Sequence, residues 1–204
     1  MAPAANGKVQ SASATVMEIP QIEIKTYVLR IVGDSPLICH AWSKKAKQEM
    51  LDKQMGKARG KKEPKNPEQD YAEAFYRTED GKPAFPTIAF KAAAVNASRQ
   101  VEGLKMTFLR GAFHTVGELV EIEGTPRQRE DMVRIAMGTA DIRFRPEFPE
   151  WAVNLVVRLN VRSMTLEQLI HLFEQAGFSA GVGEWRPERD GLYGMFHVEG
   201  VNEL

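Results

Sequence analysis

A glycine-rich stretch near the C-terminus combines several residue types that bind phosphate and bases. It reads SAGVGEWRPERDGLYGMFHVEG over residues 179–200. Successive backbone amides beside glycines can form a concavity that binds an anion. Arginines add positive charge, and an aromatic ring offers a surface on which a base can stack. The stretch therefore predicts contacts with a sugar-phosphate chain, made by Gly181, Gly183, Trp185, Arg186 and Arg189.

The same glycines also allow a purely structural interpretation. Glycine is needed where the backbone takes a positive φ or where another backbone comes close. The glycines would then shape a turn onto the final strand, and Trp185 would fill the edge of the core. The sequence leaves both interpretations open.

A lysine-rich segment is the second candidate surface. Residues 44–65 hold nine basic and three acidic residues, a net charge of +6, whereas residues 66–80 hold one basic and five acidic residues, a net charge of −4. Basic side chains on a helix and an exposed tip can follow a nucleic-acid backbone and release its counterions without reading sequence. Solvated surface, or head-to-tail contacts between copies, are the alternatives. The candidate contacts are Lys44, Lys45, Lys47, Arg59, Lys61 and Lys62.

One strand supplies a third, weaker candidate. Arg158, Asn160 and Arg162 alternate with apolar residues over residues 152–162. A sheet surface can bind extended RNA, but ordinary RRM domains place aromatic residues there for stacking, and this strand has none. Solvated polar positions are therefore the favoured interpretation.

Catalysis is not predicted. The four histidines are scattered; they are His40, His114, His171 and His197. His171 lies beside the apolar stripe of a helix and His197 lies within a strand, and neither His40 nor His114 has an obvious acid or base partner in the sequence. No G-x-S-x-G, Walker or G-x-G-x-x-G pattern is present. The single cysteine, Cys39, and the absence of CxxC or HExxH spacing predict neither a disulfide nor a metal site. No cofactor is expected.

The composition is that of a water-soluble globular domain. The chain has 204 residues, 43% of them hydrophobic and 26% charged, with 27 basic and 27 acidic residues. No window approaches the apolar length of a membrane span, and the N-terminus lacks a signal-peptide pattern, so we expect a cytoplasmic protein without membrane contacts. Residues 1–18 are small and polar and predict a disordered tail. Residues 19–204 predict one domain with an insertion at about 42–82.

Periodicity and capping signals divide this domain into strands and helices. Ser43 can cap a helix, and the T-x-x-Q patterns at Thr125 and Thr165 predict two more helix starts. The predicted strands are 22–38, strand-like material over 106–124, 152–162 and 194–201. The predicted helices are 42–58, 90–103, a short helix from Pro126 to near Gly138, and 165–177, with an exposed loop over 59–70. This order predicts an α+β, ferredoxin-like fold, in which an antiparallel sheet carries helices on one face.

Three segments, in this order, resemble the CRISPR-associated RAMP superfamily of RRM-like proteins, which includes the backbone subunits of effector complexes. They are GDSPL after the first strand, FPTIAFKAAAVNASR with Pro86, Lys91, Ala92 and Arg99, and AGVGEWRPERDGLYGMFHV with Gly181, Gly183, Arg186, Gly191 and Gly194. The resemblance implies an RRM-like domain and adds Lys91 and Arg99 to the candidate nucleic-acid contacts. A phage-borne relative that coats single strands would carry the same core.

The favoured function is a non-catalytic protein that binds single-stranded nucleic acid and coats it as a head-to-tail oligomer. The glycine and arginine stretch, the basic segment and the family resemblance support it. A RAMP-type endoribonuclease using His40 or His114 is the second hypothesis, and an assembly factor that contacts only proteins is the third. The sequence does not distinguish RNA from DNA, because no motif identifies a contact to the 2′-hydroxyl.

Overall fold

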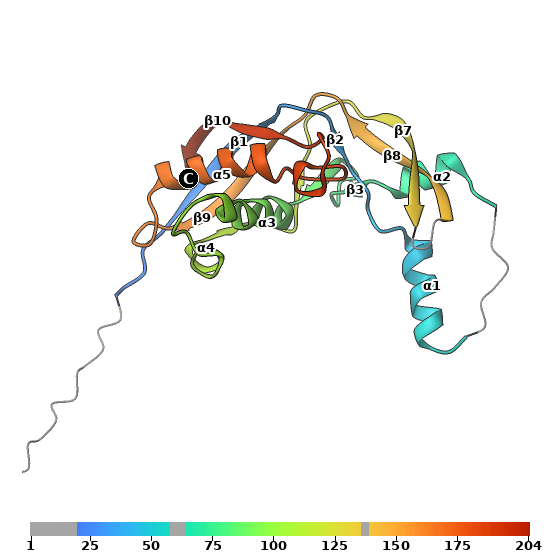
Figure 1. The fold of residues 1–204 in the computed structure, drawn as a ribbon, viewed down its shortest axis with the longest axis horizontal. Helices are drawn as coiled ribbons and strands as arrows, with labels where there is room; N and C mark the ends of the chain where they lie inside the picture. The colour runs from blue at the N-terminus through green and yellow to red at the C-terminus, as the bar shows by residue number, and fades with distance from the viewer. Residues whose placement is uncertain (1–19, 58–63, 136–138) are drawn as a thin grey trace, which may run out of the picture.

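The computed structural model describes residues 20–57, 64–135 and 139–204. Its largest sheet has four strands in the order β10-β1-β9-β5, and all of its pairs are antiparallel. The strands are β1 (Ile24–Gly33), β5 (Phe113–Thr115), β9 (Ala152–Asn160) and β10 (Phe196–Glu203). With α3 (Thr87–Ala97) and α5 (Leu166–Ser179), they follow one another in the chain as β1, α3, β5, β9, α5 and β10 (Figure 1). The prediction of an α+β protein with an antiparallel sheet is confirmed.

The hydrophobic core lies between this sheet and its two helices. Along β9, Leu155 and Val157 are fully buried while Asn154 and Arg158 are exposed, so the alternation expected from the sequence is confirmed. The buried side chains of β1 and β9 join those of α3 and α5, including Phe90 and Phe173, in one cluster. The other face of the sheet carries polar side chains such as Asn154 and Arg158 together with the part-buried Val28 and Val156.

The local sequence supports both helices, through a capping box in α5 and through helix propensity in α3. Thr165 accepts a hydrogen bond from the Gln168 amide, and the Gln168 side chain accepts one from the Thr165 amide, which completes the predicted capping box of α5. The alanines of α3 have high helix propensity, and three of them are buried. Small side chains allow α3 to pack closely beside α5.

A second region lies at the opposite end of the molecule from α4 and α5 (Figure 1). It is built on the hairpin of β7 (Arg127–Ile135) and β8 (Thr139–Phe148), whose other edge pairs with β2 (Leu37–Ile38). The predicted insertion forms α1 (Lys44–Gln54), α2 (Pro67–Glu73) and β3 (Tyr76–Arg77). A small sheet joins β3 to β4 (Pro83–Pro86) and β6 (Leu119–Glu121).

Three predicted elements are wrong. Residues 127–135 are a strand and not a helix, because nine cross-strand partners in β8 outweigh the local T-x-x-Q capping pattern. Residues 106–112 form α4 (Met106–Ala112) instead of strand-like backbone. The predicted loop over 59–70 ends in α2, because Asn66 caps the helix and Pro67 fits its first turn.

Some predictions lie outside the described residues. These are the tail over residues 1–18 and the tip of the basic segment, with Arg59, Lys61 and Lys62. Among the helices that are described, none has the length and apolar character required to span a membrane.

Candidate nucleic-acid interface

One face of the β7–β8 hairpin carries a ladder of charged side chains. Arg129 lies directly opposite Arg145, a pairing of like charges that by itself destabilises a hairpin. The carboxylates of Asp131 and Glu147 offset this repulsion. Arg129 forms ion pairs with Asp131 at 2.8 Å and with Glu147 at 3.6 Å, and Arg145 lies 3.4 Å from Asp131. Alternating charges along the diagonals therefore hold the two strands in register.

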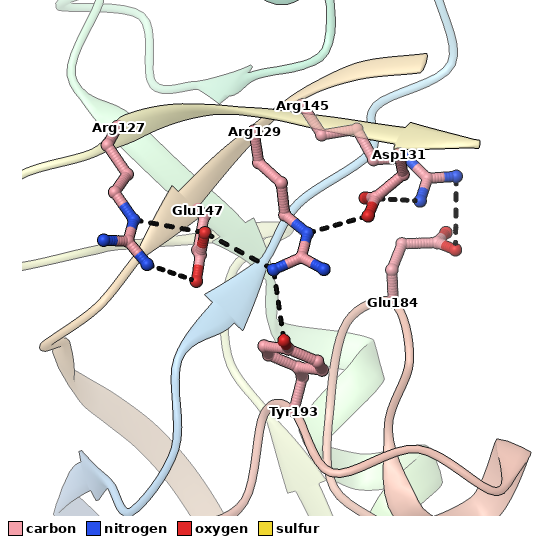
Figure 2. Close-up of polar contacts among 7 residues, drawn as sticks. All are labelled: Arg127, Arg129, Asp131, Arg145, Glu147, Glu184 and Tyr193. Carbon is pink, nitrogen blue, oxygen red and sulfur yellow. Dashed lines mark hydrogen bonds and ion pairs between the residues drawn. The ribbon is translucent and has the colours of Figure 1, made fainter. Parts of the chain in front are cut away.

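The ladder also holds the glycine-rich loop against the hairpin, as Figure 2 shows. The Arg129 guanidinium donates a hydrogen bond to the Tyr193 hydroxyl at 3.1 Å, and its Cζ lies 4.8 Å from the ring centroid. The Arg145 guanidinium reaches Glu184 of the same loop at 3.7 Å. The Arg129–Tyr193 and Arg145–Glu184 contacts thus join the hairpin to a loop that is distant from it in the sequence.

Arg145 is the most buried charge in this network, with 1% of its surface exposed. Burial lowers the pKa of its guanidinium, while the charges of Glu184 and Asp131 oppose that effect. Contact with the His40 ring and the charge of Arg145 in turn hold the pKa of Glu184 below its ordinary value. Because a buried charge is costly unless paired, this cluster is sensitive to the loss of either partner.

A cleft of about 610 Å³ opens between the hairpin and the loop. The hairpin contributes Val133, Arg134, Arg143 and Arg145, and the loop contributes Glu184, Trp185, Arg186 and Arg189. Five arginines and one carboxylate, Glu184, line the cleft. Three of the arginines also pair with carboxylates outside this lining, Arg143 with Asp141, Arg145 with Asp131 and Arg186 with Glu188, so the excess positive charge rests on Arg134 and Arg189. Clefts lined by one sign of charge concentrate ligands of the opposite sign.

The arginines of this cleft differ in how firmly the protein itself holds them. The Arg186 guanidinium donates hydrogen bonds to the Glu188 carboxylate at 3.0 Å and to the Gly183 carbonyl at 3.1 Å. Arg134 and Arg189 are exposed, and within the described ranges their side chains make no hydrogen bond or ion pair. These two guanidinium groups are therefore available to bind a phosphate.

Trp185 lines the cleft with 41% of its surface exposed, so it does not fill the edge of the core. Its backbone takes a positive φ of 54°, which is unusual for a residue other than glycine. The Tyr193 amide donates to the Trp185 carbonyl at 3.0 Å, and a side chain at Gly191 would collide with that oxygen. The loop is thus folded so that the indole ring stays at the surface, where a base can stack on it.

The other glycines of the loop serve the fold itself. The Gly181 amide donates to the Ala176 carbonyl at 2.9 Å, so it is occupied within the protein. A Cβ at Gly194 would lie 1.7 Å from the Val182 carbonyl oxygen. The structural interpretation therefore accounts for these positions, and a phosphate contact by Gly181 and Gly183 stays a prediction.

The remaining candidate contacts lie apart from the cleft or only border it. Lys91 of α3 is 2.9 Å from the His114 ring, and burial lowers the pKa of its ammonium group. Arg99 is exposed in the short turn after α3, and neither it nor Lys91 lines the cleft. Lys47 is exposed on α1, which also holds Lys44 and Lys45. The start of α1 and the cleft are neighbours, because Arg143 lines both the cleft and the hollow beneath α1.

The fold gives three of the histidines partners that are distant in the sequence. His197 lies 2.7 Å from Asp34, and His114 lies beside Lys91. The His40 Nδ1 is 3.4 Å from Arg143 and 3.7 Å from Glu184, at the edge of the charged cleft. Within the described residues no cluster of three or more His, Cys, Asp or Glu side chains is arranged to hold a metal.

Sequence reasoning missed half of this cleft. Arg134, Arg143 and Arg145 lie on a hairpin of which one strand was expected to be a short helix. The signal was present in β8, where the charged residues of DIRFRPE occupy alternate positions. A strand with a charged face and an apolar face predicts a half-buried hairpin, although not the surface that the charged face meets.

Comparisons with solved structures show that other proteins share this fold. It is similar to a chain of the Type III-B Cmr-beta bound to cognate target RNA, with a TM-score of 0.53 and 8% identity over 89% of this chain and 61% of that chain. Cmr6 from Pyrococcus furiosus matches with a TM-score of 0.47 and 13% identity, over 87% of this chain and 100% of Cmr6. No protein-family model and no curated protein sequence matches. This chain spans less than two thirds of the length of the matched Cmr-beta chain, and at 8% identity the likeness shows a shared fold.

Proposed function

We propose that this chain binds single-stranded nucleic acid through the sugar-phosphate backbone, in the arginine-lined cleft between the β7–β8 hairpin and the glycine-rich loop. The observation that carries the proposal is the convergence of Arg134, Arg189 and Trp185 on this cleft. Two guanidinium groups that the protein leaves free bind phosphates, and the exposed indole stacks on a base.

The charge ladder supports this function by keeping the walls of the cleft in place. Asp131 and Glu147 neutralise the arginines that hold the hairpin together. The positive charge that remains available to a ligand is thus that of Arg134 and Arg189. Contacts of this kind bind a strand without reading its sequence.

RNA is the favoured strand. The support is the similarity in fold to a chain of Cmr-beta, which is bound to its target RNA. We further propose that the domain is RRM-like and of the RAMP type, that it is not catalytic, and that copies associate head to tail as they coat the strand. The basic helix α1 beside the cleft and the acidic segment 66–80 supply the opposite charges for such association.

The binding proposal is tested by fluorescence anisotropy with labelled single-stranded RNA and DNA over a range of salt concentrations. For single strands, the slope of log K against log salt is about −0.7 for each phosphate neutralised. The double variant Arg134→Glu/Arg189→Glu should lose most of its affinity and flatten that slope by about 1.4. Arg110→Glu changes an exposed arginine of α4 that does not line the cleft and should bind like the wild type. No binding by the wild type, or equal loss in both variants, would contradict the proposal.

The proposed absence of catalysis is tested separately. Of the two histidines in the endoribonuclease hypothesis, His40 is the one with a carboxylate beside it, since its Nδ1 lies 3.7 Å from Glu184. Labelled RNA incubated with the wild type, His40→Ala and His114→Ala should stay intact in every case. Cleavage that the wild type performs and either variant lacks would instead establish the endoribonuclease hypothesis.

A further inference from the structure

A second group of basic side chains lies at the β5 edge of the four-stranded sheet. The Nζ of Lys91 on α3 lies 2.9 Å from the Nδ1 of His114 on β5, and Arg158 on β9 is the direct cross-strand partner of His114. Side chains of directly opposite residues stand on the same face of a sheet, so His114 and Arg158 share the face that carries no helix. None of the three residues lines the arginine cleft.

The shortness of β5 brings Lys91 to this edge. The strand has three residues and is the last of its sheet, so a side chain from α3 can pass around it. The Lys91 Nζ lies 5.7 Å from the ring centroid of the buried Phe113 and donates a hydrogen bond to the Arg110 carbonyl at 3.0 Å. These contacts hold the ammonium group beside the His114 ring.

The basic residues at this edge lack the carboxylates that neutralise the charge ladder of the hairpin. Within the described residues, none of Lys91, His114 and Arg158 forms an ion pair with Asp or Glu. Burial lowers the pKa of the His114 ring, and the charges of Lys91 on α3 and Arg158 on β9 lower it further. Like charges that converge without a counter-charge attract an anion from solution.

Hydrogen-bond donors for such an anion are present. The Arg110 carbonyl and the His114 Nδ1 leave an N–H of the Lys91 ammonium group without an acceptor among the described residues. The exposed Arg158 guanidinium makes no hydrogen bond within the same ranges. Charge-assisted hydrogen bonds from lysine and arginine are the contacts that proteins use to bind phosphate oxygens.

We propose that Lys91, His114 and Arg158 form a second anion site, which binds a phosphate group at the β5 edge of the sheet. The phosphate is either part of a bound strand or a free phosphate, and the site does not depend on the arginine cleft. A bound anion favours the protonated form of His114, so anion binding raises the pKa of that ring. The site should therefore bind more tightly as the pH falls through the pKa of His114.

Nuclear magnetic resonance of the histidine rings tests the site directly. Addition of inorganic phosphate at pH 7 should shift the His114 signals with saturation, while those of His171, exposed on α5, stay in place. His114→Gln identifies the signals. Arg158→Met and Lys91→Met should each weaken the apparent affinity by roughly tenfold, because each removes a charge-assisted hydrogen bond. Arg162→Met changes an exposed arginine that pairs with Glu23 and should leave the affinity unchanged.

A pH series tests the coupling to the His114 proton. Sulfate replaces phosphate in this series, because its charge stays the same between acidic and neutral pH. The pKa of His114 should rise when sulfate is added to the wild type and should stay constant in Arg158→Met. An unchanged pKa of His114 in the wild type, at sulfate concentrations that saturate the shift, would show that the anion lies elsewhere.

A single-stranded oligonucleotide distinguishes the two sources of the phosphate. If it shifts the His114 signals, the strand supplies the group; if only inorganic phosphate does so, the site takes a free phosphate. The inference is overturned if neither ligand shifts these signals, or if the shift persists in both Arg158→Met and Lys91→Met. A shift with phosphate in a chain that binds no strand would disprove the proposed function and leave this site in place.

Discussion

The Nη1 of Arg129 donates a hydrogen bond to the Tyr193 hydroxyl at 3.1 Å, and the Arg129 Cζ lies 4.8 Å from the centre of the Tyr193 ring. A strand residue and a loop residue 64 positions apart are joined in this way (Figure 2). The contact fixes the loop against the hairpin, and the cleft proposed to bind nucleic acid lies between them.

Tyr193→Phe should test how much of this contact depends on the hydroxyl. The variant keeps the ring under the guanidinium and removes the hydrogen bond, so the free energy of unfolding should fall by about 1 kcal/mol. Urea denaturation measures the change. Tyr71→Phe provides the control, since the Tyr71 ring packs on Phe75 and its hydroxyl makes no hydrogen bond within the described ranges. Equal effects in the two variants would show that the bond to Arg129 adds nothing.

Arg145→Met should destabilise the protein by about 3 kcal/mol, because Asp131 and Glu184 lose a buried cation. Methionine keeps much of the volume of the arginine side chain, so the loss reports on charge more than on packing. Arg134→Met, at an exposed arginine of the same hairpin, should change the free energy of unfolding by less than about 0.5 kcal/mol. A fully stable Arg145→Met protein would mean that the two carboxylates do not depend on this partner.

The pH dependence of stability should include a contribution from Glu184. Its pKa is lowered in the folded protein, so its ionised form stabilises the fold above the pKa of the unfolded chain, near 4.5. That stabilisation is lost as the pH falls below 4.5 and through the lower folded-state value. Glu184→Gln should therefore lose less stability than the wild type between pH 6 and acidic pH.

Urea midpoints measured across that range give the comparison. Glu102→Gln, at an exposed carboxylate that makes no ion pair within the part of the chain that the structure describes, should follow the wild-type curve. Parallel curves for the wild type and Glu184→Gln would show that the surroundings of Glu184 do not favour its charge.

Gly194→Ala should be among the most damaging single substitutions in the loop. A Cβ there would lie 1.7 Å from the Val182 carbonyl oxygen, at a φ of 67°. Gly103→Ala shares the positive φ, at 78°, but meets no atom within 4 Å. We expect Gly103→Ala to cost about 1 kcal/mol for the backbone conformation alone and Gly194→Ala to cost about 3 kcal/mol or more. Thermal unfolding distinguishes the two, and equal costs would rule out the close approach of Val182.

Charge reversal in the basic segment tests the second surface that the sequence predicts. Lys44→Glu/Lys45→Glu and Lys61→Glu/Lys62→Glu should each weaken binding of single-stranded RNA and reduce its salt dependence, because each pair removes two cations. The double variant Lys105→Glu/Arg110→Glu makes the same charge change at α4 and should bind like the wild type. Normal affinity in both lysine variants would leave the cleft as the candidate surface and assign α1 to solvent or to protein contacts.

The elements that could be predicted from the sequence are those whose signals are local or strictly periodic. The regular spacing of Val153, Leu155, Val157 and Leu159, with Asn154 and Arg158 on the other side, predicts which face of β9 enters the core, since a strand repeats every two residues. The capping box at Thr165 likewise fixes the start of α5, because its hydrogen bonds join residues three positions apart.

The cleft and the strand at residues 127–135 depend on contacts between distant parts of the chain. The T-x-x-Q pattern at Thr125 favours a helix locally, but pairing with β8 gives every residue of the segment a cross-strand partner. Burial of Arg145 and its ion pairs with Asp131 and Glu184 depend on chain segments up to 53 positions apart. Distant charges stabilise one another only once the fold has brought them together and removed water, so the sequence alone could not show that five arginines line one cleft.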